Sequence, residues 1–372
     1  MSKITKIEIY KMNIDYSYNI KTSLGFDSRV ENVLIKIDSD NGIYGWGEAS
    51  PYSFITGETQ ATCIDAAKFI GKLLIGKDPT NIEENTTLMK LYLPSHPSVR
   101  SAFDMAMWDI LGKKSNLPLF KILGGKNRQL RTDMTMGLEE TQEDVRTIAE
   151  KYINEGFNEI KMKTGRPGII DFEHVRTVRE IGGDKLHLKI DSNQGWDLAQ
   201  SLKNARLMEP LNLMYFEQPL PAWNLEDMVR LREKIDIPVC ADESVFDDKD
   251  AFKICKMGAA DYLNIKLGKS GGIHMGLKIN AIAESYGAKC MIGCFDETRL
   301  GLTAAVHLVL ARPNIIFLDL DSSLCHKIDP IIGGIQFGKE NKSLITMSET
   351  PGLGIDVKKN YLEGCDKFEI TS

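Results

Sequence analysis

The chain has 372 residues, enough for two or more domains, and its 42% apolar and 26% charged residues are typical of globular proteins. Its net charge of −6 gives no support for a nucleic-acid or anionic-membrane partner, and no apolar run is long enough to span a bilayer. The seven cysteines show no CxxC pairing, so we expect reduced thiols in a cytoplasmic protein.

Residues 1–125 are expected to form an α+β capping domain. Residues 4–14 and 31–50 have the pattern of antiparallel strands, with an Asp-Asn-Gly hairpin turn at 40–42. Helical patterns follow these strands. We expect the C-terminal segment, about residues 345–372, to pack back on this domain and complete it.

From residue 126 to 344, short strand patterns alternate with helical patterns. Eight runs rich in β-forming residues recur at 132–137, 157–163, 186–191, 213–217, 238–242, 261–266, 289–294 and 315–321. One helix between them begins with Thr141 and Asp144 at capping-box spacing and stops at Gly156. Eight such units predict an α/β fold with a (β/α)8-type barrel, and no GxGxxG turn supports a dinucleotide-binding domain.

A polar residue recurs at the end of each predicted strand, at intervals of 24 to 28 residues. These residues are Thr135, Lys163, Asp191, Glu217, Asp242, Lys266, Cys294 and Asp319. The C-terminal ends of barrel strands form one rim, and active sites of this fold are built there. We therefore expect these side chains to meet in one site, with Thr135 and Cys294 among the substrate contacts.

Three consecutive strands end in the carboxylates Asp191, Glu217 and Asp242. Converging carboxylates without His or Cys form a hard-oxygen site, which suits Mg²⁺ with water and substrate oxygens as further ligands. The alternative is that each carboxylate caps the following helix or pairs with a lysine. The rim rule favours the metal site over that alternative.

Two lysines end the second and the sixth predicted strands, which lie opposite each other in an eight-stranded ring. Lys163 and Lys266 would therefore face each other across the mouth of the barrel. Lys161 shares a face with Lys163, because residues i and i+2 of a strand point the same way. Adjacent ammonium groups favour a bound anion, and a substrate carboxylate would supply it. The alternative is that these lysines merely balance the carboxylates.

The last strand pattern carries Asp319 and Asp321 on one face at the rim. Additional negative charge beside three carboxylates favours a substrate with a cationic group. Helix capping by one of the two aspartates is the alternative.

The order of these residues resembles the enolase superfamily: KxK, Asp, Glu, Asp and Lys on strands 2 to 6, after an α+β cap. The lysine on strand 6 resembles the muconate-lactonizing subgroup, and the likeness extends to "GWGEA" at 45–49 and "ETRLG" at 297–301. It implies abstraction of the proton next to a carboxylate at a Mg²⁺ site. The aspartate pair on strand 8 is similar to that of the dipeptide epimerases, where it would hold the substrate α-ammonium.

The resemblance implies an isomerase that inverts the α-carbon of the C-terminal residue of an L-Ala-L-Glu-like dipeptide through an enediolate. Lys163 and Lys266 would be the two bases, and Lys161 would stabilise the negative charge. An N-acylamino acid racemase or a cycloisomerase would use the same site, and a barrel that binds metal and ligand without catalysis is an alternative of a different class. The sequence is compatible with assembly of this chain into a homo-oligomer.

Two loops of the cap, 21–29 and 50–58, are expected to select the substrate. Epimerases that act on L-Ala-D/L-Glu often carry Arg where this chain has Gly25. Three cations are candidates for the missing contact: Lys21, Arg29 and Arg299. Asp296, after the seventh strand, would instead favour a cationic side chain.

Overall fold

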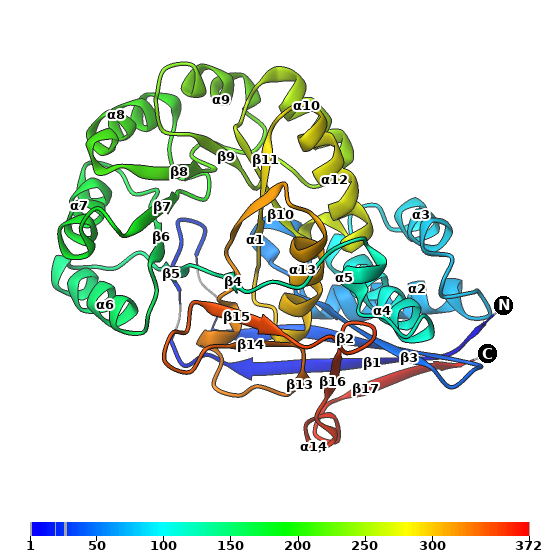
Figure 1. Ribbon diagram of the computed structural model, residues 1–372. Helices are drawn as coiled ribbons and strands as arrows, with labels where there is room; N and C mark the ends of the chain where they lie inside the picture. The colour runs from blue at the N-terminus through cyan, green and yellow to red at the C-terminus, as the bar shows by residue number, and fades with distance from the viewer. Residues whose placement is uncertain (1, 19, 26–27, 372) are drawn as a thin grey trace.

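Antiparallel strands from both ends of the chain build the cap in the computed structural model, which describes residues 2–18, 20–25 and 28–371. Strands β1 (Ile4–Asp15), β2 (Arg29–Ser39), β3 (Tyr44–Ala49) and β17 (Lys367–Thr371) pair in the order β17-β1-β2-β3. The turn between β2 and β3 contains Gly42 at φ 79°, in the left-handed region that the predicted hairpin needs. The last strand therefore lies beside the first (Figure 1).

Helices cover one face of this sheet. They are α2 (Gln60–Leu74), α3 (Ile82–Tyr92) and α4 (Pro97–Lys114), with the short helices α1 (Ser53–Thr56) and α5 (Leu119–Ile122) before and after them. Alternate residues of the strands, among them Ile35 and Ile37, pack against Ala102 and Phe103 of α4 in one buried apolar cluster. Gly45 and Gly47 let β3 lie against the backbone of α4, since an added Cβ would come within 2.0 and 1.8 Å of its carbonyl oxygens.

Residues 134–318 contain an eight-stranded parallel sheet that curls into a barrel (Figure 1). Its strands, in spatial and chain order, are β5 (Met134–Met136), β6 (Glu159–Lys163), β7 (His187–Asp191), β8 (Leu213–Glu217), β9 (Val239–Ala241), β10 (Tyr262–Lys266), β11 (Lys289–Gly293) and β12 (Ile315–Leu318). A backbone hydrogen bond of 3.4 Å from Asp133 N to Leu318 O brings the two ends of the sheet together. The predicted (β/α)8-type barrel with an α+β cap is confirmed.

Helices surround the barrel strands. They are α6 (Gln142–Asn154), α7 (Ile170–Gly182), α8 (Leu198–Met208), α9 (Leu225–Arg232), α10 (Asp248–Met257), α11 (Leu267–Ser270), α12 (Ile273–Ser285) and α13 (Arg299–Ala311), with 3₁₀ turns η1 (Glu209–Leu211) and η2 (Ser322–Cys325). The Thr141 side chain accepts a hydrogen bond from Asp144 N, so α6 begins where the sequence predicted. None of the helices described here is long and apolar enough to cross a membrane.

After the barrel the chain returns to the cap through short strands. They are β13 (Ile331–Gly333), β14 (Ile335–Phe337), β15 (Leu344–Met347) and β16 (Ile355–Val357), followed by α14 (Lys359–Leu362); β4 (Leu130–Arg131) pairs with β15. The Asp356 carboxylate accepts hydrogen bonds from Trp46 Nε1 at 2.9 Å and Tyr44 OH at 2.8 Å, both on β3. All seven cysteines are free thiols.

Glu48 fastens the cap to the barrel. Its fully buried carboxylate, on β3, accepts hydrogen bonds from Thr298 N and Oγ1 at 2.9 and 2.8 Å and from Gly301 N at 3.0 Å, at the start of α13. Asn32 Nδ2 of β2 donates to the same carboxylate at 2.8 Å and to the Asp296 carbonyl at 2.8 Å. One side chain of the "GWGEA" segment therefore fixes the loop between β11 and α13 against the cap.

Replacing this carboxylate should destabilise the protein. Glu48→Ala leaves the buried amides of Thr298 and Gly301 without an acceptor, so we expect the free energy of unfolding to fall by about 3 kcal/mol or more. Calorimetric melting measures the change. Glu31→Ala is the matched control, because its half-exposed partner Arg29 lies on the same strand and such surface pairs contribute about 0.5 kcal/mol. Equal melting temperatures for both variants would contradict this role of Glu48.

Candidate active site

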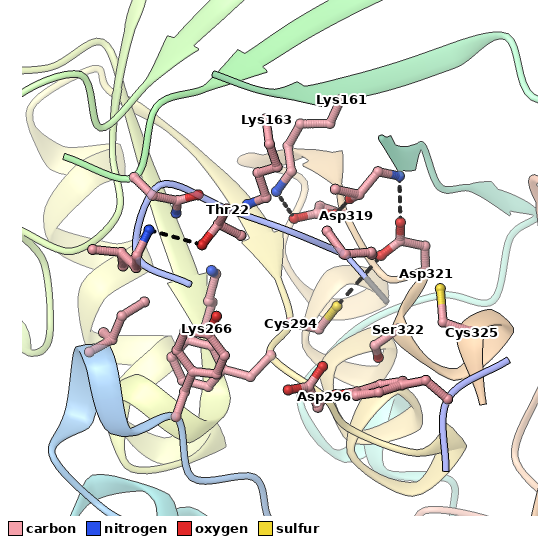
Figure 2. A pocket seen from close by; sticks show the side chains of 18 of the residues that line it. Thr22, Lys161, Lys163, Lys266, Cys294, Asp296, Asp319, Asp321, Ser322 and Cys325 are labelled. Carbon is pink, nitrogen blue, oxygen red and sulfur yellow. Dashed lines mark hydrogen bonds and ion pairs between the residues drawn. The ribbon is translucent and has the colours of Figure 1, made fainter. Parts of the chain in front are cut away.

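A cavity lies between the cap and the C-terminal rim of the barrel. The barrel lines it with Thr135, Lys161, Lys163, Asn193, Lys266, Cys294, Phe295, Asp296, Asp319, Asp321, Ser322 and Cys325. The cap lines it with Tyr16, Tyr18, Ile20, Thr22, Leu24, Tyr52 and Ile55. Figure 2 shows Lys163 and Lys266 entering from different sides, with Asp319 near Lys161 and Asp321 near Cys294.

The two strand-end lysines each form an ion pair with one carboxylate. Lys163 Nζ lies 2.6 Å from Asp191 Oδ2, and Lys266 Nζ lies 2.8 Å from Asp242 Oδ2. Their strands, β6 and β10, are four positions apart in the order of eight, so the ammonium groups approach the cavity from opposing sectors. Burial would lower the pKa of Lys266, but the carboxylates of Asp242, Glu217 and Asp191 together outweigh burial and raise it.

Lys161 is a buried ammonium group surrounded by carboxylates. Its Nζ pairs with Asp319 and lies 3.6 Å from Glu217 Oε2 and 3.8 Å from Asp191 Oδ2. Burial would lower the pKa of Lys161, but these carboxylates raise it well above its ordinary value. Lys161 therefore stays protonated and supplies a fixed positive charge among the three carboxylates.

The carboxylates of Asp191, Glu217 and Asp242 lie below the cavity and are fully buried. Glu217 Oε1 accepts a hydrogen bond from Asn264 Nδ2 at 2.6 Å, while Oε2 is buried and accepts none from the described residues. Burial raises the pKa of Glu217 to about 7, although Lys161 opposes the shift. A buried oxygen without a donor is suited to a metal ligand, so this set fits a divalent cation.

A different set of possible metal ligands lies closer together. Among the residues described, Cys294 Sγ and one oxygen each of Asp319 and Asp321 lie within 4.8 Å of one another, and the three strand-end carboxylates do not form such a group. Burial raises the pKa of the Cys294 thiol, which disfavours the thiolate that binds metals, and Asp319 already pairs with Lys161. The donor chemistry therefore favours the strand-end carboxylates for a hard cation.

The two aspartates after β12, Asp319 and Asp321, both accept hydrogen bonds from Thr135. Thr135 N donates to Asp321 Oδ2 at 2.6 Å, and Thr135 Oγ1 donates to Asp319 Oδ1 at 3.3 Å. Burial would raise the pKa of Asp319, but Lys161 lowers it to about 2. Burial and the charge of Asp319 raise the pKa of Asp321 to about 6. The pair can hold a cation at the wall of the cavity.

Two buried charged residues of the site were missed from the sequence. Lys269 Nζ lies 2.6 Å from Asp242 Oδ1 and, with Lys266, lowers the pKa of Asp242. Glu243 accepts a hydrogen bond from Asn193 Nδ2 at 3.2 Å, and burial together with the charge of Asp242 raises its pKa to about 8. The signals were the second lysine of "KLGKSGG" and the second carboxylate of "ADES".

The two predicted cap loops do reach the cavity. Ser23 Oγ donates to the carbonyls of Ser192 and Asn193 at 2.8 and 3.0 Å, which fixes the loop after Ile20 on the barrel. Residues 26 and 27 of this loop lie outside the described residues. Gly25 is not among the lining residues, and an added Cβ there would come within 2.9 Å of the Phe54 ring of the other loop.

The cations expected to bind an acidic substrate side chain are engaged elsewhere. Lys21 lies 3.2 Å from Glu140, Arg29 lies 2.7 Å from Glu31, and Arg299 lies 2.6 Å from Asp329. None of the three lines the cavity formed by the described residues. Asp296 does line it, as the sequence suggested.

Comparison with protein families gives two matches. Residues 144–361 match the enolase C-terminal domain-like family, and residues 5–124 match the N-terminal domain of the mandelate racemase/muconate lactonizing enzymes.

Individual proteins are similar over nearly the whole chain. A hydrophobic dipeptide epimerase of Enterococcus faecalis is 35% identical over 95% of this chain and 99% of its own. The crystal structure of a dipeptide epimerase from Cytophaga hutchinsonii with Mg and D-Ala-L-Val has a TM-score of 0.96 and 34% identity, covering 99% and 100% of the two chains. That of an N-succinyl Arg/Lys racemase from Bacillus cereus has a TM-score of 0.94 and 28% identity over 99% and 100%.

Cation binding should depend on the strand-end carboxylates. Glu217→Gln replaces an anionic ligand by a neutral amide, so we expect Mg²⁺ affinity to fall by more than the roughly 10- to 100-fold that loss of an outer-shell partner costs. Isothermal titration of the metal-free protein measures it, with Glu226→Gln on the exposed side of α9 as control. Full Mg²⁺ affinity in Glu217→Gln, with loss of affinity in Cys294→Ser, would assign the cation to the other cluster.

Proposed function

Because the chain belongs to the mandelate racemase/muconate lactonizing enzyme family of the enolase superfamily, we propose that it is a Mg²⁺-dependent dipeptide epimerase. The reaction would invert the α-carbon of the C-terminal residue of a dipeptide, as an isomerase. One observation carries this proposal: two lysines from opposing strands and a buried aspartate pair face the same cavity. The similarity to epimerases that bind Mg and a dipeptide supports it.

Different residues would bind the two charged ends of the substrate. Asp319 and Asp321, oriented by Thr135, would hold the α-ammonium group of the first residue. The substrate carboxylate would lie toward Asp191, Glu217 and Asp242, the residues that would hold Mg²⁺. The cation would supply Lewis-acid stabilisation of negative charge on that carboxylate.

Proton transfer would then need the two lysines on opposite faces of the α-carbon. The neutral amine of Lys163 or Lys266 takes the α-proton, and the electron pair of the broken C–H bond moves into the carboxylate, giving an enediolate. The ammonium of the other lysine returns a proton to the opposite face, so the configuration inverts. Lys161 stays protonated throughout and stabilises the developing charge electrostatically.

An N-acylamino acid racemase is the second candidate, because the chain is also similar to the N-succinyl Arg/Lys racemase. Its substrates lack a free α-ammonium group, so they give the buried aspartate pair no cation to bind. A barrel that binds ligands without catalysis remains the alternative of a different class. Absence of α-deuterium uptake in D₂O across dipeptides and N-acylamino acids would favour it.

Single lysine variants should separate exchange from inversion. Lys266→Ala leaves Lys163 able to remove and return a proton on its own face, so one epimer should still exchange its α-hydrogen with D₂O while keeping its configuration. Lys163→Ala should do the same for the other epimer, and interconversion should fall by ~10²–10⁴-fold in both. NMR over long incubations follows both signals, with Lys21→Ala as the exposed control. Near-normal interconversion by either variant would contradict the two-base assignment.

Neutralising the aspartate pair distinguishes the two candidate functions. Asp319→Asn with Asp321→Asn removes the negative charge that would face the α-ammonium group, so we expect kcat/KM for dipeptides to fall by at least ~100-fold. Turnover of N-acylamino acids should not depend on that charge. If dipeptide turnover stays at the wild-type level, the aspartates do not bind the ammonium group and the racemase becomes the better proposal.

A further inference from the structure

The groups that would bind the two charged ends of a dipeptide leave one part of the cavity unassigned. This part comprises cap residues and the start of the loop after β11: Tyr16, Ile20, Leu24, Tyr52, Ile55 and Phe295. We call it the apolar wall. Its side chains are aromatic or aliphatic, with the hydroxyls of Tyr16 and Tyr52 as its polar groups, and none of the six carries a formal charge, in contrast to the rim below them. Side chains of the substrate must lie against it, because the charged rim is occupied by the backbone groups.

Part of the apolar wall lies directly beside a proposed base. Lys266 Nζ is 4.9 Å from the centre of the Phe295 ring, and that ring stacks on Tyr52 with centroids 5.4 Å apart and planes 11° from parallel. Tyr52 in turn packs against Phe54 at 5.8 Å. The stack therefore reaches from the surface of the cap to the amine that would act on the α-carbon. A side chain attached to that α-carbon meets aromatic faces first.

The wall is held in place from both domains. Ser23 is fastened to the barrel carbonyls of Ser192 and Asn193, and Leu24 N donates to Thr22 Oγ1 at 3.2 Å. Phe295 N donates to Glu297 Oε2 at 2.6 Å, beside the segment that Glu48 fixes. Hydrogen bonds thus hold the segments that carry Leu24 and Phe295 in place.

An acidic side chain would find no free counter-charge among the described residues that line the cavity. The cations among the described lining residues are Lys161, Lys163 and Lys266, and each already pairs with buried carboxylates. The remaining charged lining residue near the wall, Asp296, is negative. A buried carboxylate without a counter-cation is strongly disfavoured, whereas apolar area gains from leaving water.

We propose that the epimerised residue carries an uncharged, apolar or aromatic side chain, seated against Phe295, Tyr52 and Leu24, and that dipeptides ending in Glu are rejected. This inference rests on the proposed dipeptide epimerase function. It departs from the L-Ala-L-Glu-like substrate that the sequence suggested. The residues that determine specificity are then the wall residues, and the lysines and aspartates act on every dipeptide alike.

The first test compares dipeptides that differ in one side chain. L-Ala-L-Leu, L-Ala-L-Phe, L-Ala-L-Glu and L-Ala-L-Lys are incubated with the Mg²⁺-loaded enzyme in D₂O, and kcat/KM is obtained from α-deuterium uptake and epimer formation. We expect Leu and Phe to exceed Glu by at least ~100-fold, because Glu leaves a charge unpaired. Glu or Lys at or above the level of Leu would overturn the inference while leaving the epimerase function intact. No uptake with any dipeptide would instead overturn the function.

The second test adds a cation to the wall. Leu24→Arg should raise the ratio of Glu to Leu turnover by at least ~10-fold, since the new guanidinium can pair with the side-chain carboxylate. Leu91→Arg introduces the same charge on the outer face of α3, where Leu91 is 74% exposed, and should leave the ratio unchanged. Ile55→Arg repeats the test from the other cap loop if Leu24→Arg does not fold. An unchanged ratio in folded wall variants would place the side chain elsewhere.

Discussion

Charge balance among buried groups is the constraint on which this structure depends. Asp191, Glu217, Asp242 and Asp319 are withdrawn from water within one small region, and unpaired buried carboxylates are too unfavourable to persist. Lys161 lies among three of them, so the ammonium group is as necessary to the fold as to the chemistry. Its neighbours keep it charged, whereas Lys163 and Lys266, which we propose as the two bases, each pair with one carboxylate at the edge of the cavity.

The barrel makes this arrangement through strand geometry. Side chains two residues apart on a strand face the same way, so each strand places one residue at the rim and another one layer below. Asp191 thus lies above Lys189, which is itself neutralised by Asp133 at 3.0 Å and Glu159 at 2.6 Å. The lower layer carries its own balanced charges, and the rim charges remain available to a cation and a substrate.

The same strand geometry explains which residues of the site could be predicted from the sequence. A polar residue that ends an apolar run is conspicuous in any sequence, and the (β/α)8 alternation places all such residues on one rim. Glu243 and Lys269 were not predicted because they lie just after the strands, Glu243 in the turn after β9 and Lys269 on the short helix α11, where polar residues are ordinary. The loop cations, among them Lys21 and Arg29, were overestimated because their partners Glu140 and Glu31 are recognisable only once the chain is folded.

The cap and the barrel are fastened together by hydrogen bonds, and each contributes a different part of the cavity. Glu48 and Ser23 anchor the cap through hydrogen bonds to the barrel, so the cap supplies most of the apolar wall while the carboxylates proposed to bind the metal lie on barrel strands. Changes in the wall can therefore alter the accepted side chain without disturbing the charge balance below. Substitution of Lys161 or Glu217 does disturb the charge balance, because it leaves several buried charges unmatched at once. Substrate choice can vary within this fold much more readily than its chemistry.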